Sequence, residues 1–341
     1  SNVHQWLGTR PEAQGYKELD YKKDLLGALE TNNLKNVAFQ FYTLFPRYDF
    51  EAAHVEDYII SSTRLETVLK HNRRVCILDV GCAMGAASAA FIEKVITWQE
   101  DENTTHPIEI FCLGIDPSID GIVIYSKLME EIKQNLISVN INLEFKPICD
   151  RFPTGIVTIK NYLREKLEDW NKPVFSNLFV MQLDTASSSN QDAITRITQY
   201  NKLQELGLEP DLILKPNKEF WHEEILGYQQ LLDTVSIEEL HIITIGTKHL
   251  ENNIQDRTIF INIQECFNEI STLVEKEFKN KHSVKTLLKS EKSVIFENPI
   301  DSYWYERNQI SGVSNFYALF QAINNDKLVN DADKLTMLEL Y

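Results

Sequence analysis

From Arg74 onward, short apolar runs alternate along the chain with stretches whose apolar positions recur at helical spacing. The first run, residues 75–80, is almost continuously apolar, which is typical of a strand covered on both faces of a parallel sheet. Further strands are predicted at 108–115, 143–149, 178–183, 211–214, 240–245 and 293–296, and helices at 86–98, 122–136, 156–170, 193–206, 223–232 and 263–279. This alternation predicts an α/β fold with a doubly wound, mostly parallel, Rossmann-like sheet.

The first 70 residues differ from the rest because they combine helical periodicity with many aromatic side chains. Between residues 19 and 34, Tyr21, Leu25, Leu26 and Leu29 have the spacing of an amphipathic helix. We expect a helical N-terminal cap or lid over residues 1–70 and a core domain over residues 71–341. The alternative is a helix that binds a partner.

Charge and composition narrow the class of protein. Fifty acidic and 34 basic residues give the 341-residue chain a net charge of −16, which repels phosphate backbones and disfavours a nucleic-acid partner. The sequence has no apolar run long enough to span a membrane and no signal peptide, so we expect a cytoplasmic protein without a membrane partner. No two cysteines form a C-x-x-C pair, which suits reduced thiols; they are Cys76, Cys82, Cys112, Cys149 and Cys266.

The segment richest in chemical information is V-C-I-L-D-V-G-C-A-M-G-A-A-S-A-A-F at residues 75–91. A buried strand ends near Asp79, a turn contains Gly81 and Gly85, and small residues then begin a helix. Glycines let a backbone turn tightly beside a ligand, and the start of a helix offers N–H groups. The turn matches neither the dinucleotide pattern G-x-G-x-x-G nor a phosphate-binding P-loop.

The stretch I-L-D-V-G-C-A-M-G-A-A-S resembles the first motif of class I S-adenosylmethionine-dependent methyltransferases, an acidic residue followed by G-x-G-x-G. Ala83 stands where the family consensus has its middle glycine. The resemblance covers roughly residues 74–250. It implies that S-adenosyl-L-methionine is the cofactor, and that it is bound by Asp79, Gly81, Cys82, Ala83 and Gly85.

A second marker is F-C-L-G-I-D-P-S at residues 111–118, a strand that ends in an acid. Asp116, followed by Pro117, could accept hydrogen bonds from both ribose hydroxyls, although it lies 37 residues after Asp79 rather than the roughly 20 of dinucleotide folds. The alternative is a turn that caps a helix. After the third predicted strand, the resemblance implies that Asp150 meets the adenine amine, and an ordinary loop aspartate is the alternative.

Two segments compete for the fourth strand, beyond which this kind of sheet places its methyl acceptor. One is N-L-F-V-M-Q-L-D-T-A-S-S-S-N, and the other contains residues 211–214 in P-D-L-I-L-K-P-N-K-E-F-W-H-E-E-I-L. We favour the second, because a helix and a strand follow it as expected for a fourth and fifth strand. Residues 178–184 would then be an insertion or an extra strand.

Three residues are candidates for removing a proton from the acceptor. His222 follows the favoured fourth strand, and Glu223 and Glu224 could orient its ring. His249 lies after the predicted fifth strand, and Asp184 precedes a hydroxyl-rich turn. The alternatives are that His222 is a surface histidine, that His249 is a structural loop histidine and that Asp184 belongs to a capped turn.

Other catalytic classes have little support in the sequence. It contains no H-x-H or H-E-x-x-H and no cysteine pair, so no metal site is expected, and it has no G-x-S-x-G. The prediction is a methyltransferase that acts on carbon or oxygen of a small or carrier-protein-bound organic molecule. Because Ser1 replaces an initiator Met, it could be a domain of a larger biosynthetic enzyme. The alternatives are a methyltransferase of RNA or ribosomal protein, and a non-catalytic interaction module.

Overall fold

The computed structural model describes residues 2–19, 33–43, 45–60, 65–102, 106–170, 177–183, 218–233, 237, 239–251, 268–278, 282–296 and 310–325. Its centre is a seven-stranded sheet in the order β3-β2-β1-β4-β5-β7-β6. The strands are β1 (Arg74–Val80), β2 (Ile108–Asp116), β3 (Ile141–Cys149), β4 (Asn177–Leu183), β5 (Glu239–Glu251), β6 (His282–Ile295) and β7 (Ile310–Asn324). The first five run parallel, and β7 pairs antiparallel with both β5 and β6. The predicted doubly wound α/β fold is confirmed.

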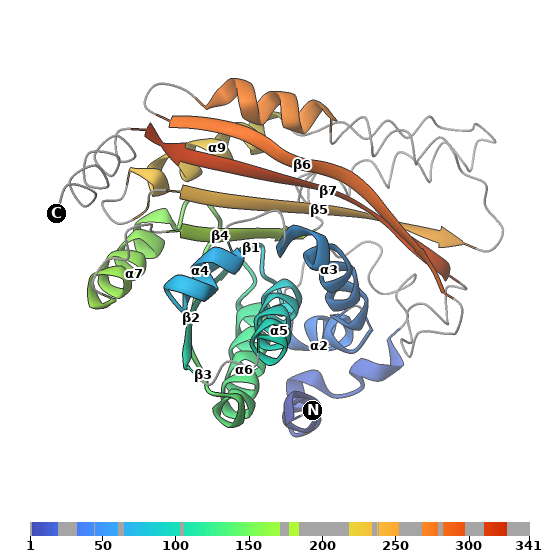
Figure 1. Ribbon diagram of the computed structural model, residues 1–341. Coiled ribbons are helices and arrows are strands. Elements are labelled where there is room, and N and C mark those ends of the chain that lie inside the picture. The colour runs from blue at the N-terminus through green and yellow to red at the C-terminus, as the bar shows by residue number, and fades with distance from the viewer. Residues whose placement is uncertain are drawn as a thin grey trace, which may run out of the picture.

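Helices cover both faces of the sheet (Figure 1). On one face lie α7 (Ile156–Asp169), α9 (Lys218–Leu232) and the helical residues 268–277. On the other lie α4 (Leu65–His71), α5 (Ala86–Asp101) and α6 (Ile119–Leu136). Successive residues of β1 supply the two cores in turn, since Cys76 and Leu78 belong to the first and Val75 and Ile77 to the second. Burial on both faces explains the unbroken apolar run in the sequence.

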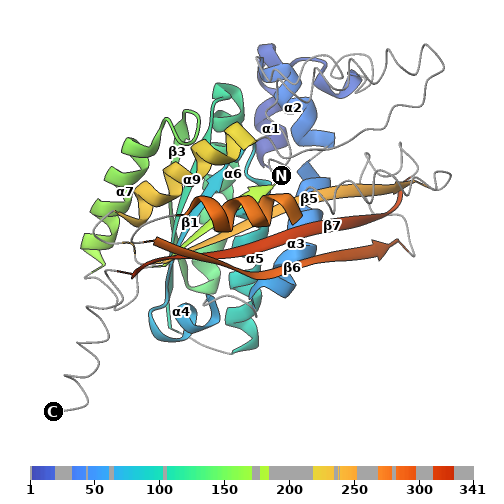
Figure 2. The ribbon, with the colours of Figure 1, turned by 90° about the horizontal axis from the view of Figure 1, so that it is seen from above.

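The remaining N-terminal helices are α1 (Asn2–Gly8), α2 (Leu34–Thr43) and α3 (Phe45–Ile60). In Figure 2, α1 and α2 lie together near the N-terminus, away from α4. α3 packs along α5, whereas Leu65, Val68 and Leu69 of α4 belong to the core beside β1. Residues before position 70 thus contribute to the sheet's own core, and the division into cap and core at residue 70 stays a prediction. Most of the amphipathic helix expected at 19–34 falls outside the described residues.

The favoured choice of fourth strand was wrong. β4 is Asn177–Leu183, which pairs with β1 on one side and β5 on the other. The predicted strand at 211–214 and the predicted helix at 193–206 lie outside the described residues. The order of helix and strand along the chain suggested the wrong segment, because only the pairing with β1 identifies a central strand.

The antiparallel part of the sheet also differs from the prediction. β5 continues to Glu251 rather than ending at 245, and β7 was not predicted. Of the strand expected at 293–296, positions 293–295 form the end of the 14-residue β6. Figure 1 shows these three as the longest strands. Polar and apolar residues mix along β6, so the sequence there lacks the continuous apolar run that marks a doubly covered strand.

Candidate functional site

The turn after β1 adopts a conformation that depends on small residues. Gly81, Ala83 and Gly85 have φ values of 68°, 44° and 91°, in the left-handed region. Ala83 is unusual there, because a Cβ disfavours that region by about 1–2 kcal/mol. This geometry gives a physical reason why the consensus of the resembled family has glycine at its position. Gly85 is the N-cap residue of α5, so the turn leads directly into a helix.

Backbone hydrogen bonds attach this turn to the end of β2. The N–H groups of Gly81 and Cys82 donate to the Ile115 carbonyl at 2.9 and 3.1 Å. The N–H of Ala83 donates to Asp116 Oδ2 at 3.0 Å, while Asp116 Oδ1 accepts from Ser118 N–H at 2.8 Å. Burial raises the pKa of Asp116, and these two hydrogen bonds oppose that shift. The Asp116 carboxylate therefore joins the turn after β1 to the segment that follows β2.

Asp79 faces the helix rather than the exposed side of the turn. Its Oδ2 accepts from Ser88 N–H at 3.1 Å and from Ser88 Oγ at 2.6 Å, and the side chain is buried. Burial raises the pKa of Asp79 to about 6. These two hydrogen bonds let Asp79 fix the start of α5, and its direct contact with a cofactor stays a prediction.

The end of β3 lies beside the end of β2. Cys149 Sγ donates to the Pro117 carbonyl at 3.8 Å, and Asp150 follows Cys149 directly. Asp150 Oδ1 accepts from the Arg151 N–H at 2.7 Å. The carboxyl ends of β1, β2 and β3 thus meet, next to the point between β1 and β4 where the strand order reverses. Open α/β sheets bind ligands at such a point.

The N-terminal helices contact the same turn. Met84 belongs to a buried cluster that also contains Leu7, Phe39 and Phe41 from the first 70 residues and Leu128 from α6. Met84 is itself buried. Helices α1 and α2 thus pack directly on the turn after β1.

The three candidates for removing a proton from the methyl acceptor have different surroundings. Asp184 follows β4 and lies outside the described residues. His249 was expected after the fifth strand, but it lies within β5, paired with Val313 of β7. His222 lies within α9, its side chain is 57% exposed, and its Nδ1 lies 3.2 Å from Glu277 Oε2. The structure thus joins His222 to the helical residues 268–277 rather than to the turn.

Neither flanking glutamate orients His222 as expected. Glu223 is exposed. Glu224 is buried and points inward, where its Oε2 accepts from Gln182 Nε2 at 2.8 Å and from the Tyr228 hydroxyl at 2.9 Å. This group of three was not predicted. Its signal in the sequence is a glutamine within an apolar strand and a glutamate four residues before a tyrosine on one helix face.

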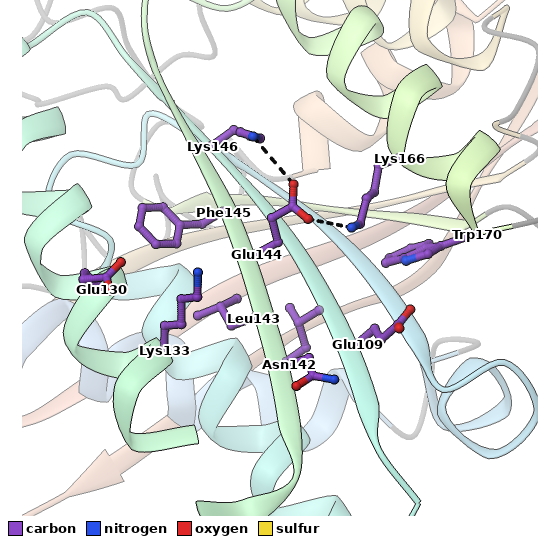
Figure 3. Close-up of a pocket in the computed structure, with 11 residues that line it drawn as sticks. Glu109, Glu130, Lys133, Asn142, Leu143, Glu144, Phe145, Lys146, Lys166 and Trp170 are labelled. Carbon is purple, nitrogen blue, oxygen red and sulfur yellow. Dashed lines mark hydrogen bonds and ion pairs between the residues drawn. The ribbon is translucent and has the colours of Figure 1, made fainter. Parts of the chain in front are cut away.

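A hollow of about 500 Å³ lies along the exposed edge of β3, between α6 and α7 (Figure 3). Figure 3 shows Lys166 and Lys146 pointing toward Glu144. Lys166 Nζ lies 2.6 Å from Glu144 Oε2, and Lys146 Nζ lies 3.6 Å from Glu144 Oε1. The β2 and β3 residues that line the hollow lie before the carboxyl ends of those strands. The hollow is therefore separate from the place where the carboxyl ends of β1, β2 and β3 meet. Within the described residues, no group of three or more His, Cys, Asp and Glu side chains could hold a metal, and no helix is long and apolar enough to span a membrane.

Solved structures similar to this chain include several methyltransferases. An S-adenosylmethionine-dependent methyltransferase from Aquifex aeolicus is 10% identical, with a TM-score of 0.30, over 74% of this chain and 88% of that one. Phosphoethanolamine N-methyltransferase 2 of Haemonchus contortus, in complex with S-adenosyl-L-methionine, is 8% identical, with a TM-score of 0.27, over 76% of this chain and 52% of that one. The MccD protein is 12% identical, with a TM-score of 0.26, over 75% and 95%.

No protein-family model matches the chain, and no curated protein matches it. Identities and TM-scores this low do not identify a function, which therefore rests on the residues of this chain.

Proposed function

We propose that the protein is an S-adenosyl-L-methionine-dependent methyltransferase that acts on carbon or oxygen of a small or carrier-bound organic molecule. The observation that supports this most is the bond between Asp116 and Ala83. It brings a ribose-binding type of acid against a glycine-containing turn at the switch point of the sheet.

The residues present fit this cofactor. Each oxygen of Asp116 accepts one backbone N–H and keeps further acceptor capacity, which ribose hydroxyls can use. Gly81 is exposed, so a ligand can approach its backbone. Asp79, Asp116 and Asp150 lie at or next to the carboxyl ends of three neighbouring strands, and their negative charge favours a sulfonium cation over the pyrophosphate of NAD. Asp150 is proposed to meet the adenine amine.

The bound cofactor supplies an electrophilic methyl group, and the chain supplies position and proton transfer. The turn and Asp116 hold the donor, and the end of β4 faces the acceptor. The base that removes the acceptor's proton is proposed to be one of His222, Asp184 and His249, of which His222 faces outward from α9 toward Glu277. Glu277, not Glu224, is the group that orients His222.

The proposal includes a cytoplasmic location. Cys76, Cys82 and Cys112 are free and buried, as suits a compartment that keeps thiols reduced. Burial raises the pKa of the Cys76 and Cys82 thiols, so they are not reactive thiolates.

Calorimetry with Asp116→Ala tests the cofactor assignment. The wild-type protein should bind S-adenosylmethionine at micromolar concentration and NAD more weakly. Asp116→Ala should lose about 1–3 kcal/mol of binding free energy, the scale of a hydrogen bond to a charged group. Asp120→Ala is the matched control, because Asp120 lies in the first turn of α6 and its change should leave binding within about twofold.

The outcomes separate the alternatives. Binding of NAD in preference to S-adenosylmethionine would refute the proposal. Unchanged affinity in Asp116→Ala with lost affinity in Asp120→Ala would move the ribose contact to Asp120. Conversion of the donor to S-adenosylhomocysteine with an added acceptor would exclude a non-catalytic binding module.

A further inference from the structure

Three buried polar side chains form a cluster beneath the carboxyl end of β4. Gln182 is the penultimate residue of β4, and Glu224 and Tyr228 lie one turn apart on α9. Relative exposures are 0% for Gln182 and Tyr228 and 1% for Glu224. Gln182 Nε2 donates to both Glu224 Oε2 and the Tyr228 hydroxyl, and that hydroxyl donates to Glu224 Oε2. A single carboxyl oxygen thus holds both neighbours.

The orientation of Gln182 depends on Glu224 and Tyr228. Its Oε1 is buried and has no hydrogen-bond partner among the described residues. Thr244, its Cα partner on β5, also has a buried Oγ1 with no partner in the described part of the chain. Within the described part of the chain, the amide of Gln182 is therefore held through its nitrogen.

The cluster also supports the loop that follows β3. The ring of Phe152 stacks on Tyr228, with centroids 5.1 Å apart. A Cβ added to Gly227, the residue before Tyr228, would lie 2.7 Å from Phe152 Cζ and 2.7 Å from Pro153 Cβ. The loop that contains Asp150 thus rests closely on α9, on the same turn that binds the end of β4.

The charge state of Glu224 follows from its surroundings. Its pKa is raised to about 8, chiefly by burial and to a smaller extent by Glu223, the adjacent acid on α9, while the hydrogen bonds from Tyr228 and Gln182 oppose the shift. The side chains that contact it from β4 and α9 are thus an amide and a phenol, and the exposed Glu223 is its neighbour along the helix. Among the described residues no cation contacts Glu224, so an ionised Glu224 would be a buried charge without a compensating partner there, which is strongly unfavourable.

We infer that the Gln182–Glu224–Tyr228 cluster positions two walls of the cofactor site, the end of β4 and the loop after β3, through a protonated Glu224. This inference rests on the proposed function. Glu224 is a positioning residue, since it acts through Gln182 and Tyr228. Binding of the donor is then linked to the protonation of a carboxyl group that does not touch the donor.

The test compares the wild-type protein with Glu224→Gln, since glutamine has the shape and hydrogen-bonding groups of a protonated glutamate. The dissociation constant of S-adenosylmethionine is measured by calorimetry from pH 6.5 to 9.5. If the ionised form does not bind, wild-type affinity falls about tenfold by pH 9 relative to Glu224→Gln, because only about a tenth of the molecules are then competent. The donor's own amine titrates equally with both proteins, so it cancels in the ratio.

Glu223→Gln provides the matched control, because it removes the same charge from the adjacent exposed residue. It should keep the fall in donor affinity at high pH, displaced slightly toward lower pH, because Glu223 raises the pKa of Glu224. Glu224→Ala should weaken donor binding at pH 7, whereas Glu224→Gln should stay within about twofold of wild type. A purely structural role would lower the melting temperature of Glu224→Ala without creating a difference in pH profile between wild type and Glu224→Gln.

Equal pH profiles of wild type and Glu224→Gln, with donor binding intact at pH 7, would refute this inference and leave the proposed function standing. Loss of binding by Glu224→Gln at pH 7 would also refute it, since the neutral isostere would then fail to replace the acid. Failure of the wild-type protein to bind S-adenosylmethionine at any pH would refute the proposed function, and the inference with it.

Discussion

Replacing Gly114 with alanine tests how the sheet supports the turn after β1. A Cβ at Gly114 in β2 would lie 2.4 Å from Cζ, 2.7 Å from Cε2 and 2.8 Å from the hydroxyl oxygen of Tyr125. Carbon atoms in contact are about 3.5–4.0 Å apart, so the ring would have to move by about 1 Å. Tyr125 is fully buried and its hydroxyl lies 3.4 Å from Cys112 Sγ, which leaves little room.

The same ring supports the cofactor turn. A Cβ at Gly85 would lie 2.8 Å from Tyr125 Cδ2, so Tyr125 packs against both Gly114 and Gly85. Overpacking a core costs about 1–3 kcal/mol, and we expect the upper end of that range because the fully buried Tyr125 ring lies against both Gly114 and Gly85. Gly114→Ala should therefore lower the free energy of unfolding by about 3 kcal/mol and also weaken S-adenosylmethionine binding.

Urea unfolding and calorimetry measure the two effects. The control is Gly8→Ala, where no atom lies within 4 Å of the added Cβ; it should change stability by less than about 0.5 kcal/mol. Adding Tyr125→Leu to Gly114→Ala removes the ring and should restore part of the lost stability. A Gly114→Ala protein as stable as Gly8→Ala would refute the close packing of Tyr125 on β2.

Two further predictions concern proton binding. Asp79 and Glu224 have pKa values raised to about 6 and about 8, so the folded chain holds their protons more tightly than the unfolded chain. Their contribution to stability is fully present below about pH 4 and is lost as the pH rises through these values. In urea unfolding between pH 4.5 and 7, Asp79→Asn should therefore lose less free energy of unfolding than the wild type. Equal slopes of unfolding free energy against pH would contradict this. His222→Ala should reduce turnover by a factor of about 10²–10⁴ while donor affinity stays within about twofold of wild type, and Glu277→Gln should reduce turnover less. Full activity in His222→Ala would reject His222 as the base.

The elements that the sequence determined are those whose signal is local. The run at residues 75–80 has to be a strand buried on both faces, and positions 81–85 have to turn before the small residues of α5. Asp116 at the end of β2 follows from the same reasoning. Each of these features depends on neighbours within a few positions, where burial pattern and backbone sterics act directly.

The tertiary structure alone decided which segment lies beside β1 and what the polar side chains contact. Residues 177–183 and 211–214 are both apolar, and only pairing with β1 and β5 identified the first as the fourth strand. Glu224 and His222 are two positions apart on α9, so one turns inward to Gln182 and the other outward to Glu277. Such contacts join residues more than 40 positions apart, and no pattern along the chain encodes them, because they depend on which faces of the sheet and helices come together.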